Sequence, residues 1–547
     1  MSALHGTRLK SFRSGRNRAT SLRAFSAALT ACFVLLSCGV PESQAPSPGG
    51  APLAGARPNI VLILADDLSF RDLSAWGQTR FSTPNLDRLA AGGVRFTQAY
   101  AGAPECAPSR GTLLTGLHTG HAPIRQNSSA RGQDHLSDGD VTIAEVLKSA
   151  GYRTAFTGKW GVGLPGTPGV PYKQGFDLAF GFYDQARAHT FYPRYLYENE
   201  KRIELPGNEG FDMERLYRYN GALEPAVEDV NRYDDNGDLV PHGVDDPAGA
   251  VNSQTLIEER ALEFVRQPSD APFFLYFATQ LPHGPAIIDN LGEFHERDEF
   301  PSVKHQEWAA MVSRLDSFVG RLVETLEDLQ VLENTILLFA SDNGYSMCGY
   351  FGRGNQPTNW PDDPFFENKG PFRGGKFSAL EGGTRVPLFV YWSGKIEPSV
   401  SSVPVWLVDF MPTFVELSGA RHEGAVDGRS LLPLVEGRED EFPADRPLYW
   451  EKNREQAVRL GPWKAFRKTP DDAVELYLIE EDLGGERDLA AQYPEIVSRV
   501  ERIMEEDRTD HDWYWNPHET REDFEAKRKR AADLGQLQVS RRANTPD

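Results

Sequence analysis

Cysteine is scarce in this chain: only four occur among its 547 residues, at positions 32, 38, 106 and 348. So few cysteines exclude a disulfide framework, and the fold must therefore be held together by a hydrophobic core. Positive charge is also in short supply, because 58 lysines and arginines face 79 aspartates and glutamates and leave a formal net charge of −21. This balance argues against a nucleic-acid partner, since no basic excess is available to neutralise phosphates. An anionic ligand would need a local concentration of lysine, arginine and histidine.

The apolar run at the N-terminus, residues 24–36, is too short to span a bilayer stably. It follows a stretch, residues 8–23, with six lysines and arginines and no acidic residue, an order typical of a secretory signal. The run ends in LLSCG, which resembles a bacterial lipobox with Cys38 as the lipidated first residue; ordinary signal cleavage nearby is the alternative. We expect residues 1–37 to be a signal peptide and the exported bacterial protein to lie in the periplasm or at the cell surface, anchored to the membrane by lipid.

The remaining residues divide by composition. Residues 38–57 are rich in Pro, Gly, Ala and Ser, which is typical of a flexible tether. From 58 to 437, short apolar runs alternate with helical patterns, which predicts an α/β domain with a largely parallel sheet. Within it, the polar stretch 184–250 looks like an inserted excursion that faces the substrate. Four short alternating runs in 438–515 predict a smaller subdomain on an antiparallel sheet, and 516–547 form a charged tail.

Polar, reactive side chains follow four of the predicted strands at their carboxyl ends. Ligands of open α/β sheets bind beyond those ends, so we expect the four groups to converge on one active site. The groups are Asp66 and Asp67 after residues 60–65, Lys159 after residues 154–157, His283 after residues 273–279, and Asp342 and Asn343 after residues 335–340.

Asp66, Asp67, Asp342 and Asn343 all offer oxygen atoms, and no soft ligand accompanies them. Three carboxylates and an amide carbonyl suit a hard cation, Ca²⁺ or alternatively Mg²⁺, far better than Zn²⁺. An Asp-Asp pair after a strand is often only a helix cap and a solvated neighbour. The second strand that ends in Asp-Asn-Gly favours a metal site.

The run CAPSRG at residues 106–111, continued as TLLTG, resembles the C-x-P-S-R-G signature of the type I sulfatases. Taken alone, it could be a buried cysteine at the start of a helix, with Pro108 in the first turn. Other segments match the family in the same order, from RPN at 57–59 to ELY at 475–477, and the resemblance extends to about residue 494. It implies the alkaline-phosphatase-like α/β fold: a large, mostly parallel mixed sheet sandwiched by helices, with a smaller C-terminal antiparallel domain. It also implies a hydrolase acting on a sulfated carbohydrate or aryl sulfate.

The resemblance implies a role for each matching residue. A maturation enzyme of that family oxidises the cysteine to formylglycine, whose hydrated aldehyde is the nucleophile, and its oxygen joins the four ligands around one Ca²⁺. The implied roles are nucleophile for Cys106, support of the nucleophile for Arg110, contact with sulfate for Lys159 and Lys376, and, together with Lys376, protonation of the departing alcohol for His283.

The chain departs from the family at Gly161, where a histidine that triggers sulfate release is common. His118 or His121, which follow the nucleophile in sequence, could replace it, or another base acts. Cys348 is open to two interpretations, a buried thiol or one that lines the site.

Two other functions compete with the sulfatase hypothesis. One is hydrolysis of a phosphonate or phosphodiester by the same superfamily. The other is a non-catalytic, glycan-binding lipoprotein, which would apply if Cys106 stays unmodified.

Overall fold

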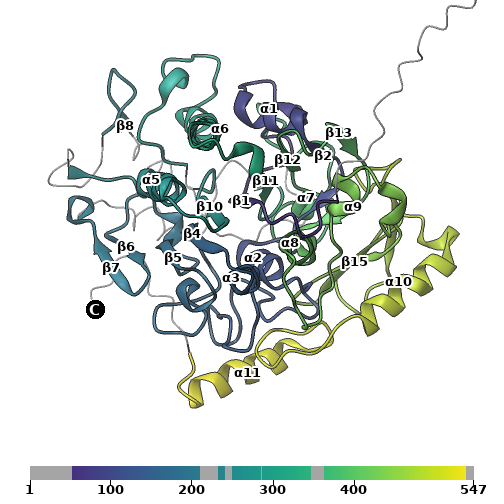
Figure 1. Ribbon diagram of the computed structural model, residues 1–547. Helices are drawn as coiled ribbons and strands as arrows, with labels where there is room; N and C mark the ends of the chain where they lie inside the picture. The colour runs from purple at the N-terminus through teal and green to yellow at the C-terminus, as the bar shows by residue number, and fades with distance from the viewer. Residues whose placement is uncertain (1–51, 210–231, 241–248, 285, 347–361, 538–547) are drawn as a thin grey trace, which may run out of the picture. The chain divides into compact units, whose positions relative to one another are not determined.

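A computed structural model describes residues 52–209, 232–240, 249–284, 286–346 and 362–537 (Figure 1). The predicted signal peptide, Cys38, Cys348 and the last ten residues of the tail lie outside these ranges. Within them, no helix combines the length and the apolar character needed to cross a bilayer.

A ten-stranded mixed sheet forms the centre of the fold. Its five middle strands, β11 to β5, run parallel, and antiparallel strands flank them on both sides. This confirms the predicted fold class. In sheet order the strands are β13 (Ser399–Ser401), β2 (Val94–Phe96), β12 (Leu388–Trp392), β11 (Thr335–Ser341), β1 (Asn59–Ala65), β10 (Phe273–Ala278), β4 (Arg153–Lys159), β5 (Leu178–Phe182), β6 (Tyr195–Glu198) and β7 (Lys201–Glu204).

Helices cover both faces of this sheet (Figure 1). Strand β1 shows why, because all seven of its residues are buried: Val61 and Ile63 point into one hydrophobic core, while Ile60 and Leu62 point into the other. A parallel strand buried on both faces reads as a continuous apolar run, which is why the sequence reveals it. The first core holds α1 (Pro84–Gly92), α5 (Ser253–Arg266) and α6 (Val303–Asp328), and the second holds α2 (Cys106–Thr115), α3 (Ile143–Ser149) and α8 (Phe410–Ser418).

A separate antiparallel sheet follows near the C-terminus, as predicted. Helix α10 (Pro494–Glu506) packs on it through the buried Val500 and Met504, and α11 (Arg521–Asp533) begins with a capping box at Thr520. The strands are β15 (Pro447–Lys452), β16 (Glu455–Leu460), β17 (Trp463–Arg467) and β18 (Glu475–Leu478).

Two segments differ from the expected organisation. The end of the predicted tether lies on the folded protein, because the Leu53 side chain is buried and the Gly55 N–H donates to Glu416 O in α8. Part of the predicted excursion, the hairpin of β6 and β7, extends the large sheet at its edge. Its β7 residues are mostly exposed, so their polarity resembles that of a loop.

Candidate functional site

The register of the central sheet brings the predicted metal ligands together. Ala65 pairs with Ser341 in the parallel strands β1 and β11, so Asp66 and Asp342 leave the sheet side by side. The chain then turns through Asp67, whose φ of 64° lies in the left-handed region. This turn lets the Asp67 N–H donate to Asp342 Oδ1 at 3.2 Å.

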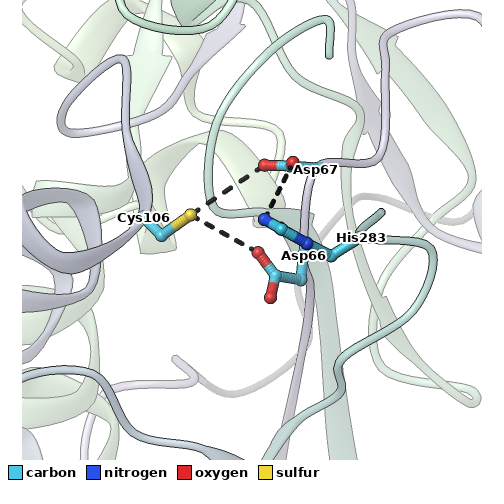
Figure 2. Close-up of side chains that lie close together, drawn as sticks. All are labelled: Asp66, Asp67, Cys106 and His283. Carbon is cyan, nitrogen blue, oxygen red and sulfur yellow. Dashed lines mark hydrogen bonds and ion pairs between the residues drawn. The ribbon is translucent and has the colours of Figure 1, made fainter. Parts of the chain in front are cut away.

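Cys106 is the first residue of α2 and faces the two aspartates (Figure 2). Its Sγ lies 3.5 Å from Asp66 Oδ1 and 3.9 Å from Asp67 Oδ1. Asn127 fixes this end of the helix, because its Oδ1 accepts from the Ala107 N–H at 2.9 Å. The helix N-terminus favours an anionic oxygen at residue 106.

The Cys106 thiol is unsuited to attack in its own right. Burial raises its pKa to about 12, an effect that Lys159 and Lys376 only partly offset. The thiol therefore keeps its proton at neutral pH, whereas a reactive cysteine is a thiolate with a lowered pKa. A nucleophile at this position needs a different functional group.

Three buried cations each bond to one of the three aspartates. Lys159 Nζ, at the end of β4, lies 2.7 Å from Asp66 Oδ2. Arg110 stands one helical turn after Cys106 and donates from Nε and Nη2 to Asp342 Oδ2 at 3.0 and 2.8 Å.

Lys376 is the third cation, and its Nζ lies 2.6 and 2.7 Å from the two Asp67 oxygens. Burial alone would raise the pKa of Asp67, but the charges of Lys376 and Lys159 hold it well below its usual range. The site thus gathers three cations in a chain that is acidic as a whole, and each cation is paired with a carboxylate.

His283 completes the group in Figure 2. Its Nε2 lies 3.3 Å from Asp67 Oδ2 and 3.3 Å from Lys376 Nζ, and its Nδ1 contacts Gly284 O. Burial lowers the pKa of the imidazole well below its usual value. The neutral ring therefore donates from Nδ1 to the carbonyl and accepts from Lys376 at Nε2, so the pair shares one proton that could move to a substrate oxygen.

The donor set fits a hard divalent cation. Carboxylate oxygens of Asp66 and Asp67 lie within 4.8 Å of each other and of Cys106 Sγ, whose place an oxygen would take in the modified residue. Asn343 supplies an independent sign: its Nδ2 donates to Asp67 Oδ1 at 2.8 Å, while its buried Oδ1 has no hydrogen-bond partner. A buried carbonyl oxygen without a donor is costly unless a cation satisfies it.

The structure does not bring His118 and His121 to this site. Both follow the opposite end of α2, a helix of ten residues and therefore about 15 Å long. Their rings contact Asp427 instead, with His121 Nδ1 3.1 Å from both of its carboxylate oxygens. Neither histidine is therefore positioned to act as the replacement base.

His189 is a site residue that the sequence interpretation missed. It follows β5, another parallel strand, and its Nε2 lies 3.4 Å from Lys159 Nζ. The strand-end rule that found Lys159 and His283 would have found His189 as well, had the short run LAFGF been recognised as a strand.

Comparisons with known proteins relate most of the chain to sulfatases. A family model described as Sulfatase matches residues 58–420. The N-acetylgalactosamine-6-O-sulfatase of Bacteroides thetaiotaomicron is 28% identical over 495 residues, which cover 83% of this chain and 93% of that protein. The human N-acetylgalactosamine-6-sulfatase is 31% identical over 435 residues, covering 76% and 72%. The crystal structure of Ps i-CgsB with k-i-k-neocarrahexaose superposes with a TM-score of 0.66 at 26% identity, covering 88% of this chain and all of that one.

Proposed function

Because the chain belongs to the sulfatase family and is a hydrolase of sulfate esters, we propose that its substrate is a sulfated carbohydrate and that formylglycine made from Cys106 is its nucleophile. The observation that carries the proposal is the position of Cys106. It stands at a helix N-terminus, against two aspartates and among three cations, as a thiol too weakly acidic to attack.

Formylglycine resolves this mismatch. Its hydrate carries two hydroxyl groups on one carbon, one to attack sulfur and one whose deprotonation re-forms the aldehyde and expels sulfate. A formylglycine-generating maturation enzyme is the partner that this chemistry requires.

The buried cations account for binding of an anionic ester. Lys159, Lys376 and Arg110 reach the site from three different segments of the chain, so their positive charges would surround the sulfur of a bound ester from several sides. Such preorganised charge stabilises the negative charge that develops in the transition state. His283 and Lys376 share the proton that the departing alcohol needs.

Asp66, Asp67, Asp342, Asn343 and the oxygen of modified residue 106 would hold Ca²⁺, or alternatively Mg²⁺. A bound dication supplies Lewis-acid polarisation and neutralises negative charge. The partnerless Asn343 Oδ1 supports this assignment, because it is an oxygen ligand that no protein donor satisfies.

The relatives support the substrate class. The bacterial and mammalian proteins named above are N-acetylgalactosamine-6-sulfatases, and the Ps i-CgsB structure contains a sugar chain. Desulfation of defined sulfated oligosaccharides, beginning with N-acetylgalactosamine 6-sulfate, tests the proposal. If formylglycine-bearing protein hydrolysed neither a sulfated sugar nor an aryl sulfate, the proposal would be overturned.

Two measurements separate the competing functions. The phosphonate monoester hydrolase of Agrobacterium radiobacter shares the fold at 18% identity with a TM-score of 0.53. Single-turnover rates on an aryl sulfate and an aryl phosphonate distinguish sulfate ester hydrolysis from phosphonate hydrolysis. Conversion of Cys106 to formylglycine lowers the intact mass by about 18 Da. An unmodified thiol in protein from its own organism would favour the non-catalytic glycan-binding lipoprotein.

The proposed cellular location rests on the N-terminal sequence. We place the protein outside the cytoplasm, tethered to a membrane by lipid on Cys38. Metabolic labelling with a fatty-acid probe, compared with a Cys38→Ser variant, tests the anchor, and equal labelling of both proteins would contradict it.

A further inference from the structure

Two lysines reach the site, and each lies between one aspartate and one histidine. Lys376 Nζ bonds to Asp67 at 2.6 Å and lies 3.3 Å from His283 Nε2. Lys159 Nζ bonds to Asp66 at 2.7 Å and lies 3.4 Å from His189 Nε2. The site therefore contains two Asp–Lys–His rows with the same order of groups, and His189 is the one member of these rows that has no role in the function proposed above.

The two rows meet at their histidines. The imidazole rings of His189 and His283 stack with centroids 3.9 Å apart and planes within 5° of each other. His189 is buried, with 6% of its surface exposed, so protein groups surround its imidazole ring. Its contacts with Lys159 and His283 link the two rows.

The backbone around His189 is held firmly. Gln280, which stands three residues before His283, donates from Nε2 to Ala188 O at 2.7 Å and to Thr190 O at 3.1 Å. These bonds fix the residues on either side of His189 relative to the loop that carries His283. His189 is thus held in place through the backbone on either side of it.

Residues 184–189, the segment that carries His189, cover the place where a side chain at position 161 would lie. Gly161 has a φ of +83°, and a Cβ there would lie 2.8 Å from Gln185 Oε1 and 3.5 Å from Arg110 Cδ. Gln185 is buried, and neither polar atom of its carboxamide has a hydrogen-bond partner. Residues 184–189 therefore fill this space with Gln185 and bring an imidazole to Lys159 from a different strand end.

We propose that His189 is a positioning residue of the sulfatase site and acts through Lys159. Its Nε2 accepts one proton of the Lys159 ammonium while Asp66 accepts a second, which leaves the third donor free for a sulfate oxygen. A lysine side chain loses rotamer entropy when it is fixed, and His189 fixes Lys159 before the substrate arrives. The inference rests on the sulfatase function proposed above and extends it to a residue outside the family motifs.

Three variants separate hydrogen bonding from packing. His189→Gln keeps an acceptor near the position of Nε2, His189→Phe keeps a ring to stack on His283 but loses the acceptor, and His121→Phe at the other end of α2 is the matched control. Loss of one hydrogen bond to a charged group predicts that His189→Phe weakens sulfate binding about tenfold. His189→Gln should stay within about threefold of the wild type, and the control should not change.

The first readout is the dissociation constant of inorganic sulfate, measured by calorimetry on the mature, metal-loaded protein. The second is the split between KM and kcat on an aryl sulfate, where His189→Phe should act mainly on KM. Equal sulfate affinity for His189→Phe and the wild type would overturn the inference. A loss in His189→Gln as large as that in His189→Phe would also overturn it.

A double-mutant cycle distinguishes an effect through Lys159 from a general effect on folding. In a Lys159→Met background, His189→Phe should cause no further loss of sulfate affinity, because the residue through which His189 acts is gone. A further tenfold loss would refute the route through Lys159. The intact mass of each variant shows whether formylglycine is present, so a failure of the proposed sulfatase chemistry in the wild type is distinguishable from a failure at His189.

Discussion

Helix α2 has a cluster of histidine and carboxylate side chains at each end, and the two clusters differ in how their hydrogen bonds are satisfied. At the first end, Asp66, Asp67, Cys106 and His283 come together; beyond the second, His118, His121 and Asp427 do. Residue types alone suggest a metal site in both places. The two clusters differ in whether each hydrogen-bond acceptor has a donor.

The far cluster has its donors and acceptors matched. His118 Nδ1 accepts from the Gly120 N–H at 3.1 Å, so the neutral ring carries its proton on Nε2, 3.6 Å from both Asp427 and Asp507. A metal at Nε2 would require that proton on Nδ1, where the backbone already donates. This cluster therefore acts as a clamp between α2 and the end of α10. At the Cys106 end, by contrast, Asn343 Oδ1 has no donor.

The largest expected difference between the two ends concerns turnover. Cys106→Ala removes the precursor of the proposed nucleophile, so it should lower kcat on an aryl sulfate by at least about 10⁴-fold. The variant should still fold, because removing a thiol leaves only a small cavity. His121→Ala should keep turnover near the wild-type rate. Measurable multiple turnover by Cys106→Ala would end the assignment of the nucleophile.

The second prediction concerns Ca²⁺ affinity. Asn343→Ala removes the partnerless oxygen and should weaken Ca²⁺ binding about 10- to 100-fold, whereas Asp427→Asn in the far cluster should not change it. Calorimetric titration after treatment with a chelator measures both values. If Asp427→Asn weakened Ca²⁺ binding and Asn343→Ala did not, the Ca²⁺ site would lie at the far cluster and not at Cys106.

The contrast also shows what the sequence could and could not predict. Buried parallel strands appear as apolar runs, so β11 was expected at residues 335–340 and extends over Thr335–Ser341. The polar residues after such strands converge because of the register of the sheet. The prediction that His118 or His121 replaces the base fails because both residues follow Cys106 closely in sequence but lie beyond the far end of α2. His189 was missed because its strand, β5, is short and contains Gly181.

The third prediction tests proton transfer at the Cys106 end. His283→Ala removes the partner of Lys376, so it should slow hydrolysis of sulfated sugars, whose alcohols leave poorly, by about 10²- to 10³-fold. Hydrolysis of nitrophenyl sulfate should fall much less, because that leaving group needs no proton. His118→Ala in the far cluster should not alter the ratio of the two rates. An equal loss on both substrates would argue against His283 as part of the general acid.

The smallest expected effect lies in the clamp and depends on pH. The hydrogen bond to Asp427 raises the pKa of His121. Burial alone would raise the pKa of Asp427, but the hydrogen bonds from the His121 ring and from the His118 N–H lower it. The raised histidine contributes stability that is complete below its unfolded pKa of about 6.5 and is lost as pH rises through its folded pKa. The lowered aspartate contributes stability that is present above about pH 4 and is lost as pH falls.

The clamp should therefore stabilise the fold most between about pH 4 and 6.5. His121→Gln removes the charge, so its melting temperature should fall below that of the wild type by a few degrees at pH 5.5 and by less at pH 8.5. Differential scanning calorimetry at both pH values, with equal Ca²⁺, measures the two differences. A deficit that grows toward pH 8.5 would contradict the clamp, because a neutral imidazole cannot hold Asp427 more tightly than a charged one.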